Sequence, residues 1–595
     1  MRALTHFSGL LLAATLPLSA LAELPAETIQ PSINAELAEH TKVFNKEIYK
    51  VTDNLYSAVG WSIANSVMVI APEGLIIFDT GESPEESAKV FAEFRKISDK
   101  PVKAIVYSHF HPDHINGVKG FVSEEQVKSG EVQVYAHESL LDNVVTQGAL
   151  VGPILAMRSA YTFGAALNAA DRKDMNGGIG PIAVGGQSTF IAPTITFKDK
   201  LDTTIAGLPV QFRWAPSEAP DEIVMYIPSS GVLLSAEVDQ GPTLPNIHTL
   251  RGAKFRDPVA WVNSLDLLRS FHAQYLVPSH GRPVAGVDQV EEVLRMTRDG
   301  IAYIHDQTVR WMNKGLTPDE LVEKVKLPPH LAGYTPYLRE YYGTVKHSVR
   351  QIYEGYLGWF KGDPVDLDPI PPVEKAKRMV ELMGGHDKVL LAAGDAYLQG
   401  DYQWAAELAT YVIRIDHEDK LARDIKARSF RKQGYAQMNI NWRNWYLMSA
   451  MELEGTLGEE QLTEMAQRLR GTFLSPDMLK NLPVKVFLQN WVTRVDPEKS
   501  ADVNLTLGFV FPDIDQQWAL ELRRGVVQLH QGIPDGTTLK LTLDKSYLDT
   551  VISGQNSLLK GAVLGDVKVD GNLLDIKTFL GCFDFADSPI NLTLR

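Results

Sequence analysis

The fold of this chain is decided by the stretch VKAIVYSHFHPDH, residues 102–114. Its first half is apolar and rich in β-branched residues, which predicts a strand over Val102–Ser108. Its second half holds three imidazoles and a carboxylate within six residues, although the 595-residue chain has only 15 histidines. A surface loop that happens to be rich in histidine is the plain alternative. The density of ligands favours a strand that leads into a metal site.

The spacing within this stretch is compatible with two metal ions. His109 and His111 lie two residues apart, so their side chains can leave an extended backbone on the same side and share one ion. Asp113 and His114 follow Pro112, which favours an irregular loop, so both can turn toward a second ion. Imidazoles and carboxylates suit a borderline metal such as zinc without a thiolate.

The region from about residue 45 to 300 has the pattern of an α/β fold. Short β-rich segments alternate with Gly and Pro and with a few helical stretches. Ser83–Ile97 is expected to form an amphipathic helix that begins at Ser83-Pro84. The strand over Gly74–Asp79 would place the Asp79 carboxylate at a sheet edge, where sites in layered α/β folds often lie. The other expected strands are Val51–Ala58, Ser66–Ala71, Val102–Ser108 and Val132–Ala136.

Two further regions follow this α/β part. From Leu321 helical patterns dominate, and Gly400–Ala409 is expected to join two helices of a compact helical domain. After about Ser475 the apolar residues alternate with period two, which predicts three to five antiparallel strands followed by helices. The expected strands of this α+β region are Val503–Phe509, Trp518–Arg523, Val526–His530, Thr538–Leu543 and a last strand over Ile590–Leu594.

Charge and composition exclude several classes of protein. The formal net charge of −15 argues against a nucleic-acid partner, because phosphate binding usually needs a basic face. A hydrophobic content of 45% and a charged content of 22% are ordinary for a soluble globular protein, so stable membrane insertion is not expected. Cys582 is the only cysteine, which rules out an intramolecular disulfide.

The first 22 residues have the features of a secretory signal peptide. Arg2 precedes an apolar run over Leu10–Leu18, and small residues lead to Ala22. This run is too short for a permanent membrane helix. We expect cleavage after Ala22 and export of the mature protein to the periplasm or the medium.

Three further candidate ligands follow other apolar strands. Glu218 comes after Leu208–Trp214, Glu237 after Gly231–Leu234, and His280 after Tyr275–Val277. Each of them alone would be interpreted as a surface carboxylate or a capping histidine. Their repeated position just after a strand, in order behind the first motif, indicates one site at the rim of a sheet.

In this order the motifs resemble the alkylsulfatases of the metallo-β-lactamase superfamily, which are exported zinc enzymes of the dodecyl-sulfate-hydrolysing type. The resemblance spans nearly the whole mature chain. It implies an αββα sandwich as catalytic domain over residues 23–340, a helical dimerisation domain over 341–472, and a sterol-carrier-like α+β domain over 473–595. It also implies a homodimer. Beyond the ligands, it is carried by Pro245–Gly252, His280–Arg282, Pro372–Arg378, Met383–Gly385, Gly400–Trp404 and Trp442–Leu447.

The resemblance also assigns two zinc ions per chain and their ligands. It implies that His109, His111 and Glu218 hold the first ion, and that Asp113, His114 and His280 hold the second. Glu237 would bridge the two ions, and Asp113 would count as catalytic as well as a ligand. A carboxylate at position 218, where the broader superfamily usually has histidine, fits the sulfatase branch better than the lactamase branch.

Two residues near the ligands are candidates for handling the substrate. Arg251 can grip two oxygens of a sulfate group with its guanidinium fork, with a surface arginine as the alternative. His248 can donate a proton to the leaving group, with a structural histidine as the alternative. The segments Ala149–Ala170 and Gly177–Gly186 are candidates for lining an alkyl-chain tunnel.

Three functional hypotheses follow. The first is zinc-dependent hydrolysis of alkyl sulfate esters to an alcohol and inorganic sulfate by a metal-activated water. The second keeps the two-zinc hydrolase but changes the substrate to a phosphate ester, a lactone or a β-lactam. The third is a lipid or surfactant carrier with a structural metal site, although such a site normally needs only four ligands.

Overall fold

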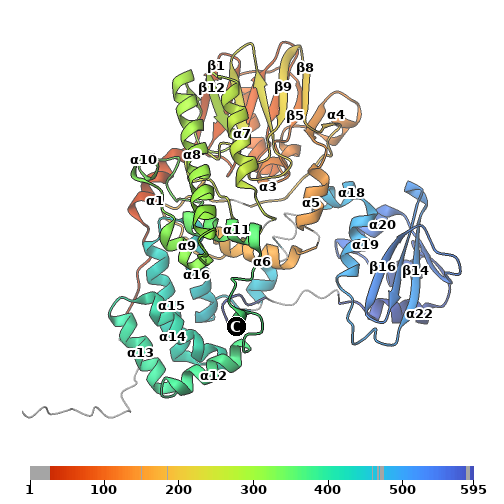
Figure 1. Ribbon diagram of the computed structural model, residues 1–595. Coiled ribbons are helices and arrows are strands. Elements are labelled where there is room, and N and C mark those ends of the chain that lie inside the picture. Colours follow the sequence, from red (N-terminus) through yellow and green to blue (C-terminus); the bar gives the residue numbers. More distant parts are fainter. Residues whose placement is uncertain are drawn as a thin grey trace, which may run out of the picture.

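A computed structural model describes residues 27–594, apart from 149, 184, 253, 459, 466, 467, 469–474 and 585–589 (Figure 1). The predicted signal peptide, residues 1–22, lies outside the described residues. In the part of the chain that is described, no helix combines the length and apolar character needed to cross a bilayer.

The first sheet is built in chain order. Within the described residues seven strands pair sequentially, antiparallel from β1 to β4 and parallel from β4 to β7. The single strand expected over Val51–Ala58 is wrong, because a turn at Asp53-Asn54 folds this stretch into a hairpin. Asp and Asn favour such turns through their short polar side chains. The strands are β1 (Glu47–Thr52), β2 (Leu55–Val59), β3 (Ser66–Ile70), β4 (Leu75–Phe78), β5 (Val102–Val106), β6 (Gln133–His137) and β7 (Ile195–Phe197).

A second sheet packs face to face on the first. The interface is a buried apolar layer that includes Phe78 and Val106 from the first sheet and Phe212, Met225 and Leu234 from the second. Burial on both faces explains the continuous apolar run of β4, LIIF, whose four residues are all buried. The second sheet has the order β13 (Val284–Ala285), β12 (Tyr275–Pro278), β11 (Val232–Ala236), β10 (Ile223–Ile227), β9 (Leu208–Trp214) and β8 (Lys200–Ile205).

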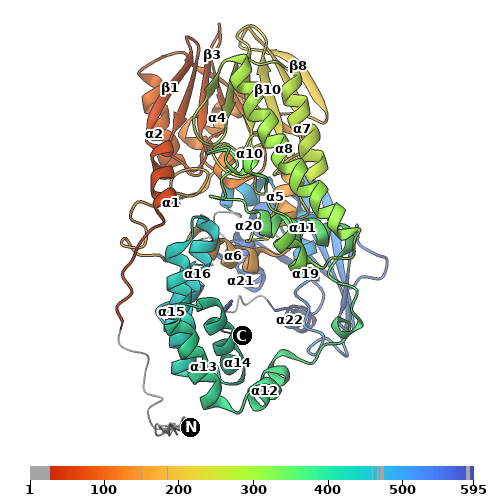
Figure 2. The ribbon, with the colours of Figure 1, turned by 60° about the vertical axis from the view of Figure 1, so that its left-hand side comes forward.

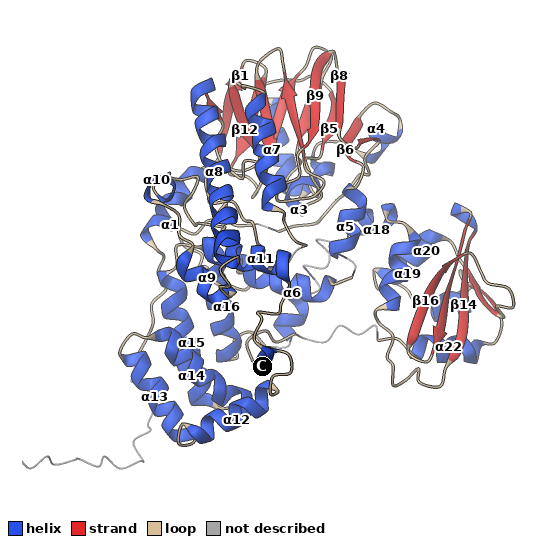
Figure 3. Ribbon diagram, viewed as in Figure 1, coloured by secondary structure: helices blue, strands red, loops and turns tan. Residues whose placement is uncertain are grey.

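Helices cover the outer faces of both sheets and complete an αββα sandwich (Figure 3). Val90 and Phe94 of α2 (Pro84–Arg95) pack against the first sheet. Trp261 of α7 (Pro258–Ser270) and Leu294 of α8 (Val287–Met312) pack against the second. The remaining helices of this region are α1 (Ala35–His40), α3 (Pro112–Ile115), α4 (Glu124–Lys128), α5 (Leu140–Gly148), α6 (Gly152–Phe163), α9 (Pro318–Lys324), α10 (Pro329–Ala332) and α11 (Val345–Leu357), with 3-10 turns at Thr41–Phe44, Val118–Gly120 and Pro364–Asp366.

A helical region follows, and it lies below the sandwich in Figure 2. Gly400, at a φ of 82°, ends the turn between α13 and α14, and the Asp401 side chain caps α14. The last helix, α16, packs against α6 of the preceding region, and Tyr435 of α15 donates a hydrogen bond to Asp171 at 2.7 Å. The helices are α12 (Pro372–Leu382), α13 (His386–Leu398), α14 (Tyr402–Ile415), α15 (Lys420–Ala436) and α16 (Ile440–Glu454).

The C-terminal region is an α+β unit, drawn in blue to one side of Figure 1. Its sheet has the order β16 (Val526–Gln531), β15 (Gln516–Arg523), β14 (Asn504–Phe511), β17 (Leu539–Thr542) and β18 (Lys568–Asp570). The expectation of purely antiparallel strands is wrong for one pair, because β14 and β17 run parallel. Its helices are α18 (Pro476–Asn481), α19 (Val484–Val492), α20 (Lys545–Ile552), α21 (Leu558–Leu564) and α22 (Leu573–Gly581), with a 3-10 turn at Pro512–Ile514.

The expected last strand over Ile590–Leu594 is also wrong. The backbone N–H groups of Leu592, Thr593 and Leu594 donate to the carboxylate of Glu452 in α16. These groups are satisfied by a buried carboxylate in place of a neighbouring strand, so the alternating pattern of side chains forms no ladder here.

Candidate metal centre

The candidate ligands lie where strands of both sheets end. His109 follows β5 after two residues, Glu237 comes directly after β11, and His280 follows β12 after one residue. The irregular loop expected after Pro112 is wrong, because Pro112 opens the one-turn helix α3, where a proline costs no hydrogen bond. This short helix brings Asp113 and His114 into one group with Glu237 and His280.

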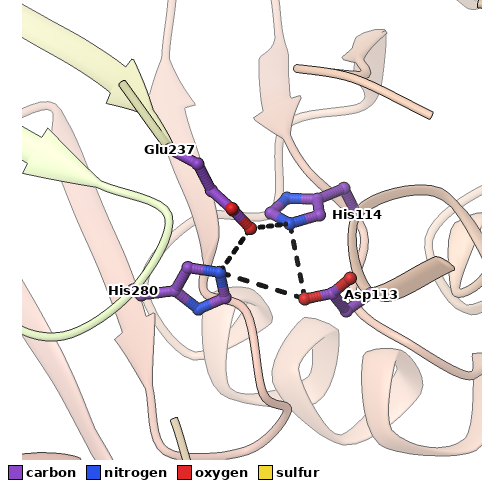
Figure 4. A group of neighbouring side chains, drawn as sticks. All are labelled: Asp113, His114, Glu237 and His280. Carbon is purple, nitrogen blue, oxygen red and sulfur yellow. Dashed lines mark hydrogen bonds and ion pairs between the residues drawn. The ribbon is translucent and has the colours of Figure 1, made fainter. Parts of the chain in front are cut away.

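Four side chains converge in one group, shown in Figure 4. One carboxylate oxygen of Glu237, Oε1, lies 2.9 Å from Nε2 of His114 and 2.7 Å from Nε2 of His280. An Asp113 oxygen, Oδ2, lies 3.4 Å and 3.9 Å from the same two nitrogens. His114, His280 and Glu237 are buried, with side-chain exposures of 0–1%, and Asp113 is exposed by 19%.

A second group shares Glu237 with the first. His109, His111 and Glu237 each offer a ligand atom within 4.8 Å of the others. The Nε2 atom of His109 lies 2.8 Å from Nδ1 of His111 and 3.9 Å from the Glu237 Oε1 atom. Glu218 is not in either group, although it lines the same cavity as Glu237 and His111.

In His114 and His280 the Nδ1 atom, which points away from Glu237, already has a hydrogen-bond partner. This partner determines whether the Nε2 atom facing Glu237 can donate or accept. Nδ1 of His114 lies 2.8 Å from an Asp79 carboxylate oxygen, and Nδ1 of His280 lies 2.8 Å from the Ile63 carbonyl oxygen. In a neutral ring with its proton on Nδ1, the Nε2 atom is an acceptor. Two such acceptors then face the carboxylate of Glu237, an arrangement that a cation between them stabilises. The donor set therefore fits a metal ion, and oxygen and imidazole donors suit zinc.

Asp79 lies behind the ligands and links His114 to the neighbouring strand ends by hydrogen bonds. Its carboxylate accepts hydrogen bonds from the hydroxyls of Ser108 at 2.9 Å and Ser279 at 2.8 Å, and from the Ser108 backbone N–H at 2.8 Å. Asp79 has a φ of 58°, in the left-handed region that an aspartate tolerates better than most residues. Its place at the end of an apolar strand was visible in the sequence, and the structure turns it toward His114 rather than toward the cavity.

The site carries strong electrostatic perturbations. Burial, together with the neighbouring His114, lowers the pKa of His109 to about 3. Burial also disfavours a charge on His114, but Asp113 and Asp79 outweigh it and raise the pKa of this imidazole well above its usual value. Despite burial, His280 and His114 hold the pKa of Glu237 well below its usual value. The carboxylates thus attract positive charge to this point, which is the field that a metal cation requires.

One cavity joins this centre to an apolar wall. It has a volume of about 360 Å³, and its polar end is lined by His111, Asp113, Glu218, Glu237, Arg251 and Tyr342. Phe163 and Ala166, from the Ala149–Ala170 segment, and Ile179, from the Gly177–Gly186 segment, line the wall with Leu457 and Met465. Both segments that the sequence nominated for a tunnel therefore contribute to this wall.

The two substrate candidates have different places. Arg251 lines the cavity, with Nη2 at 3.5 Å from Nε2 of His111, and Arg158 donates to its backbone carbonyl at 2.9 Å. His248 is not among the residues that line the cavity, and its ring stands edge-on to His347 at 5.9 Å between centroids. Burial lowers the pKa of His248 to about 4, with smaller contributions from Arg256 and Arg158.

Sequence reasoning missed three residues of this region. Tyr342 lines the cavity from a segment about 60 residues beyond His280. Gln240 and Arg256 contact the carboxylate of Glu218. Gln240 lies three residues after Glu237, and this proximity was the one signal available. No local pattern marks Tyr342 or Arg256.

Protein-family profiles match three consecutive parts of the chain. The metallo-β-lactamase superfamily matches residues 59–280, alkyl sulfatase dimerisation matches 317–456, and alkyl sulfatase C-terminal matches 472–593. These matches support the predicted order of domains, while the predicted boundaries at residues 340 and 472 stay predictions.

Named relatives cover most of the chain. A linear primary-alkylsulfatase of Pseudomonas sp. (strain ATCC 19151) is 77% identical over 528 residues, which are 89% of this chain and 100% of that protein. The alkyl/aryl-sulfatase BDS1 of Saccharomyces cerevisiae is 32% identical over 95% of this chain and 86% of its own. The solved structure of the stereoselective inverting sec-alkylsulfatase Pisa1 from Pseudomonas sp. has a TM-score of 0.84 and 30% identity, covering 98% of this chain and 96% of that one.

Proposed function

This chain belongs to the alkylsulfatases of the metallo-β-lactamase superfamily, and from that premise we propose that it hydrolyses linear primary alkyl sulfates to an alcohol and inorganic sulfate with two zinc ions. The family and the fold predicted from the sequence are confirmed by the family matches and by the solved relative. The preference for primary esters is inferred from the relative that is 77% identical.

A single cavity supports this proposal most directly. It brings together the carboxylate and imidazole cluster, the guanidinium of Arg251 and an apolar wall that includes Phe163 and Leu457. An alkyl sulfate has matching parts, namely an anionic head, an ester oxygen and a chain that prefers to leave water. Because the whole chain is acidic, with a net charge of −15, a local cation such as Arg251 is needed to hold that anionic head.

The metal ligands in this proposal are those that the geometry groups together. Asp113, His114 and His280 would hold one zinc ion, and His109 and His111 the other, with Glu237 between them. Glu218 would complete the second set from its place on the cavity wall. When bound, the zinc ions lower the pKa of water and so supply a nucleophile at neutral pH.

The side chains around this centre would orient the ester. The Arg251 guanidinium presents parallel N–H donors that match two oxygens of a sulfate group. Arg158 holds the backbone of the Arg251 segment through hydrogen bonds to the carbonyls of Leu250 at 2.6 Å and Arg251 at 2.9 Å. The role predicted for His248 as a proton donor stays a prediction, since this ring lies against His347 and not along the cavity.

Assembly and location complete the proposal. The match to an alkyl sulfatase dimerisation family supports a homodimer. Apolar side chains remain exposed on the helical region, including Leu382 (81%), Leu398 (63%) and Trp404 (48%), and a second subunit would shield such surface. The basic and apolar character of residues 1–22 supports export to the periplasm or the medium.

The decisive experiment measures zinc content and sulfate release on the purified mature protein. We expect two zinc ions per chain and turnover of dodecyl sulfate that exceeds turnover of a phosphate monoester, a lactone or a cephalosporin. Hydrolysis of one of these in preference to any alkyl sulfate would favour another ester as substrate. Binding of dodecyl sulfate without release of sulfate would favour a carrier.

Replacement of the sulfate-binding arginine tests the cavity itself. Arg251→Ala should lower kcat/KM for dodecyl sulfate by about 10- to 150-fold, because a charge-assisted hydrogen bond contributes about 1.5–3 kcal/mol. Arg213→Ala is the matched control, since Arg213 pairs with Asp202 on the surface of the second sheet. Equal activity of both variants would remove Arg251 from the proposal.

A further inference from the structure

Glu218 is held from both sides by two side chains. Its Oε1 atom forms an ion pair with Nη2 of Arg256 at 2.6 Å, and its Oε2 atom accepts a hydrogen bond from the Gln240 amide. The side chains of Glu218 and Arg256 are only 3% and 4% exposed, and Gln240 is 1% exposed. A buried carboxylate with both oxygens engaged has one orientation available to it.

One of these two side chains, Gln240, also connects Glu218 to Glu237. The Gln240 amide also donates to Glu237 Oε2 at 3.0 Å, so a single NH₂ group spans the two carboxylates. Glu237 thereby uses one oxygen toward Gln240 and the other toward His114 and His280. The spacing between Glu218 and Glu237 therefore depends on Gln240.

Both holding residues are fixed on one backbone residue, Asn246. Its N–H donates to the Gln240 side-chain oxygen at 2.7 Å, and its carbonyl accepts from Nη1 of Arg256 at 2.6 Å. Arg251 lies five residues further along the same segment. The arrangement of the carboxylates and the segment that carries the sulfate-binding arginine are thus parts of one hydrogen-bonded unit.

The other ligands rely on different partners. His114 is oriented by Asp79, and His280 by the carbonyl of Ile63. A disturbance of Gln240 or Arg256 should therefore affect the His109 and His111 side of the centre more than the side of His114 and His280.

We propose that Gln240 and Arg256 are positioning residues that hold Glu218 and Glu237 at the spacing required by the metal ion on the His109 and His111 side. This inference rests on the proposed function, because it assigns residues to the same metal centre. Arg256 supplies the positive charge that the buried Glu218 carboxylate needs. Gln240 sets the distance between the carboxylates of Glu218 and Glu237, because its amide donates to both. Partners that orient metal ligands typically contribute 10- to 100-fold in metal affinity.

The test uses the full mature chain in the variants Arg256→Met, Arg256→Lys and Gln240→Leu. Zinc content after gel filtration and cobalt titration of the metal-free protein are measured together with kcat and KM. We expect Arg256→Met and Gln240→Leu to bind one ion as the wild type does and the other about 10- to 100-fold more weakly. Arg256→Lys keeps the charge and should recover part of that affinity.

Arg443→Met is the matched control for removal of a buried guanidinium. Arg443 in α16 is also buried, but it donates to the backbone carbonyls of Asp171 at 2.7 Å and Ser32 at 3.3 Å and is in neither metal group. This control should lower the melting temperature and leave both metal affinities unchanged. The comparison separates a loss of folding stability from a specific loss of one metal ion.

The outcomes distinguish this inference from the proposed function. If the wild type binds two ions and releases sulfate while Gln240→Leu and Arg256→Lys both bind two ions with wild-type affinity, the inference is overturned and the function stands. If Arg256→Met does not fold, the other two variants decide in the same way. A wild type that binds no metal and releases no sulfate overturns both.

Discussion

Two buried glutamates, Glu237 at the metal centre and Glu452 in α16, have contrasting surroundings. Each is 1% exposed. Glu452 accepts hydrogen bonds from the Tyr161 hydroxyl and from the backbone N–H groups of Thr593 at 3.0 Å and Leu594 at 2.9 Å. Every partner of Glu452 is a donor. Glu237 instead faces imidazole nitrogens whose rings are already engaged on the other side.

This difference separates a structural carboxylate from a functional one. The cost of burying Glu452 is offset within the protein, because its lone pairs meet hydrogen-bond donors from two segments of the chain, α6 and residues 592–594. Glu237 Oε2 accepts from the Gln240 amide, but Oε1 faces the Nε2 atoms of His114 and His280, which are acceptors when these rings are neutral with the proton on Nδ1, and Asp113 adds a further carboxylate oxygen. A cluster of acceptors is unfavourable unless positive charge enters it, and that surplus is the structural mark of a cation site.

Removing the charge of Glu237 should change zinc content and sulfate release more than any other substitution considered for the two glutamates. Glu237→Gln removes the carboxylate that both metal groups share, so we expect sulfate release to fall by about 1,000-fold or more, the scale of losing a principal electrostatic contribution to catalysis. Zinc content and sulfate release measure this effect. A Glu237→Gln enzyme with two ions and wild-type activity would show that the surplus of acceptors has no function.

Removal of zinc with a chelator tests the same metal centre through the stability of the fold. A ligand present at 100 times its Kd stabilises the folded state by about 2.7 kcal/mol, so removal of zinc should lower the melting temperature of the wild type. The shift should be smaller in Glu237→Gln and unchanged in Glu452→Gln. Equal shifts in all three proteins would remove the distinction between the two glutamates.

Changing Glu452 should affect stability and spare the chemistry. Glu452→Gln replaces one acceptor oxygen by an NH₂ group that faces donors, which should lower the free energy of unfolding by about 1–3 kcal/mol. Deletion of residues 590–595 removes the donors themselves and should produce a similar loss, measured by denaturant titration. Zinc content should remain at the wild-type value. A loss of zinc in either variant would contradict a purely structural role.

A partly exposed carboxylate, Glu124, is expected to contribute less to stability than either buried glutamate. Glu124 in α4 lies 2.9 Å from Lys480 of the C-terminal region and 2.9 Å from Lys128. Lys480 and then Lys128 lower the pKa of Glu124 to about 2. The stability from this contact is fully present above the unfolded pKa of about 4.3, and it is lost as the pH falls through about 2.

Neutralising Glu124 should therefore cost little. Glu124→Gln is expected to lower stability at pH 7 by less than about 1 kcal/mol, with a smaller effect at high salt, because surface ion pairs are weak and screened. Unfolding measured at pH 7 and pH 3 should show the difference from wild type shrinking at the lower pH. A loss as large as that of Glu452→Gln would mean that this contact holds the two regions together.

Part of the metal centre could be predicted because each ligand is marked by its local neighbourhood. His109, Glu237 and His280 all follow apolar strands, and strands of a sandwich end at a shared rim. Local pattern also misled at Pro112, which opens a helix turn, and at Ile590–Leu594, whose alternation satisfies the strand pattern without a neighbouring strand to pair with. The periodicity of a segment indicates which of its faces is apolar, but it does not show whether a neighbouring strand is present to pair with it.

The amino-acid sequence by itself indicated the family, because the motifs that carry the resemblance are short segments, and through that resemblance it predicted the αββα sandwich and the candidate metal ligands. Only the tertiary structure decided which groups face each other. It seated Glu218 between Gln240 and Arg256, turned His248 toward His347 and brought the chain end to Glu452. The physical reason is that a buried polar group must find its partner across the packed core, and packing chooses that partner from segments that are remote in sequence.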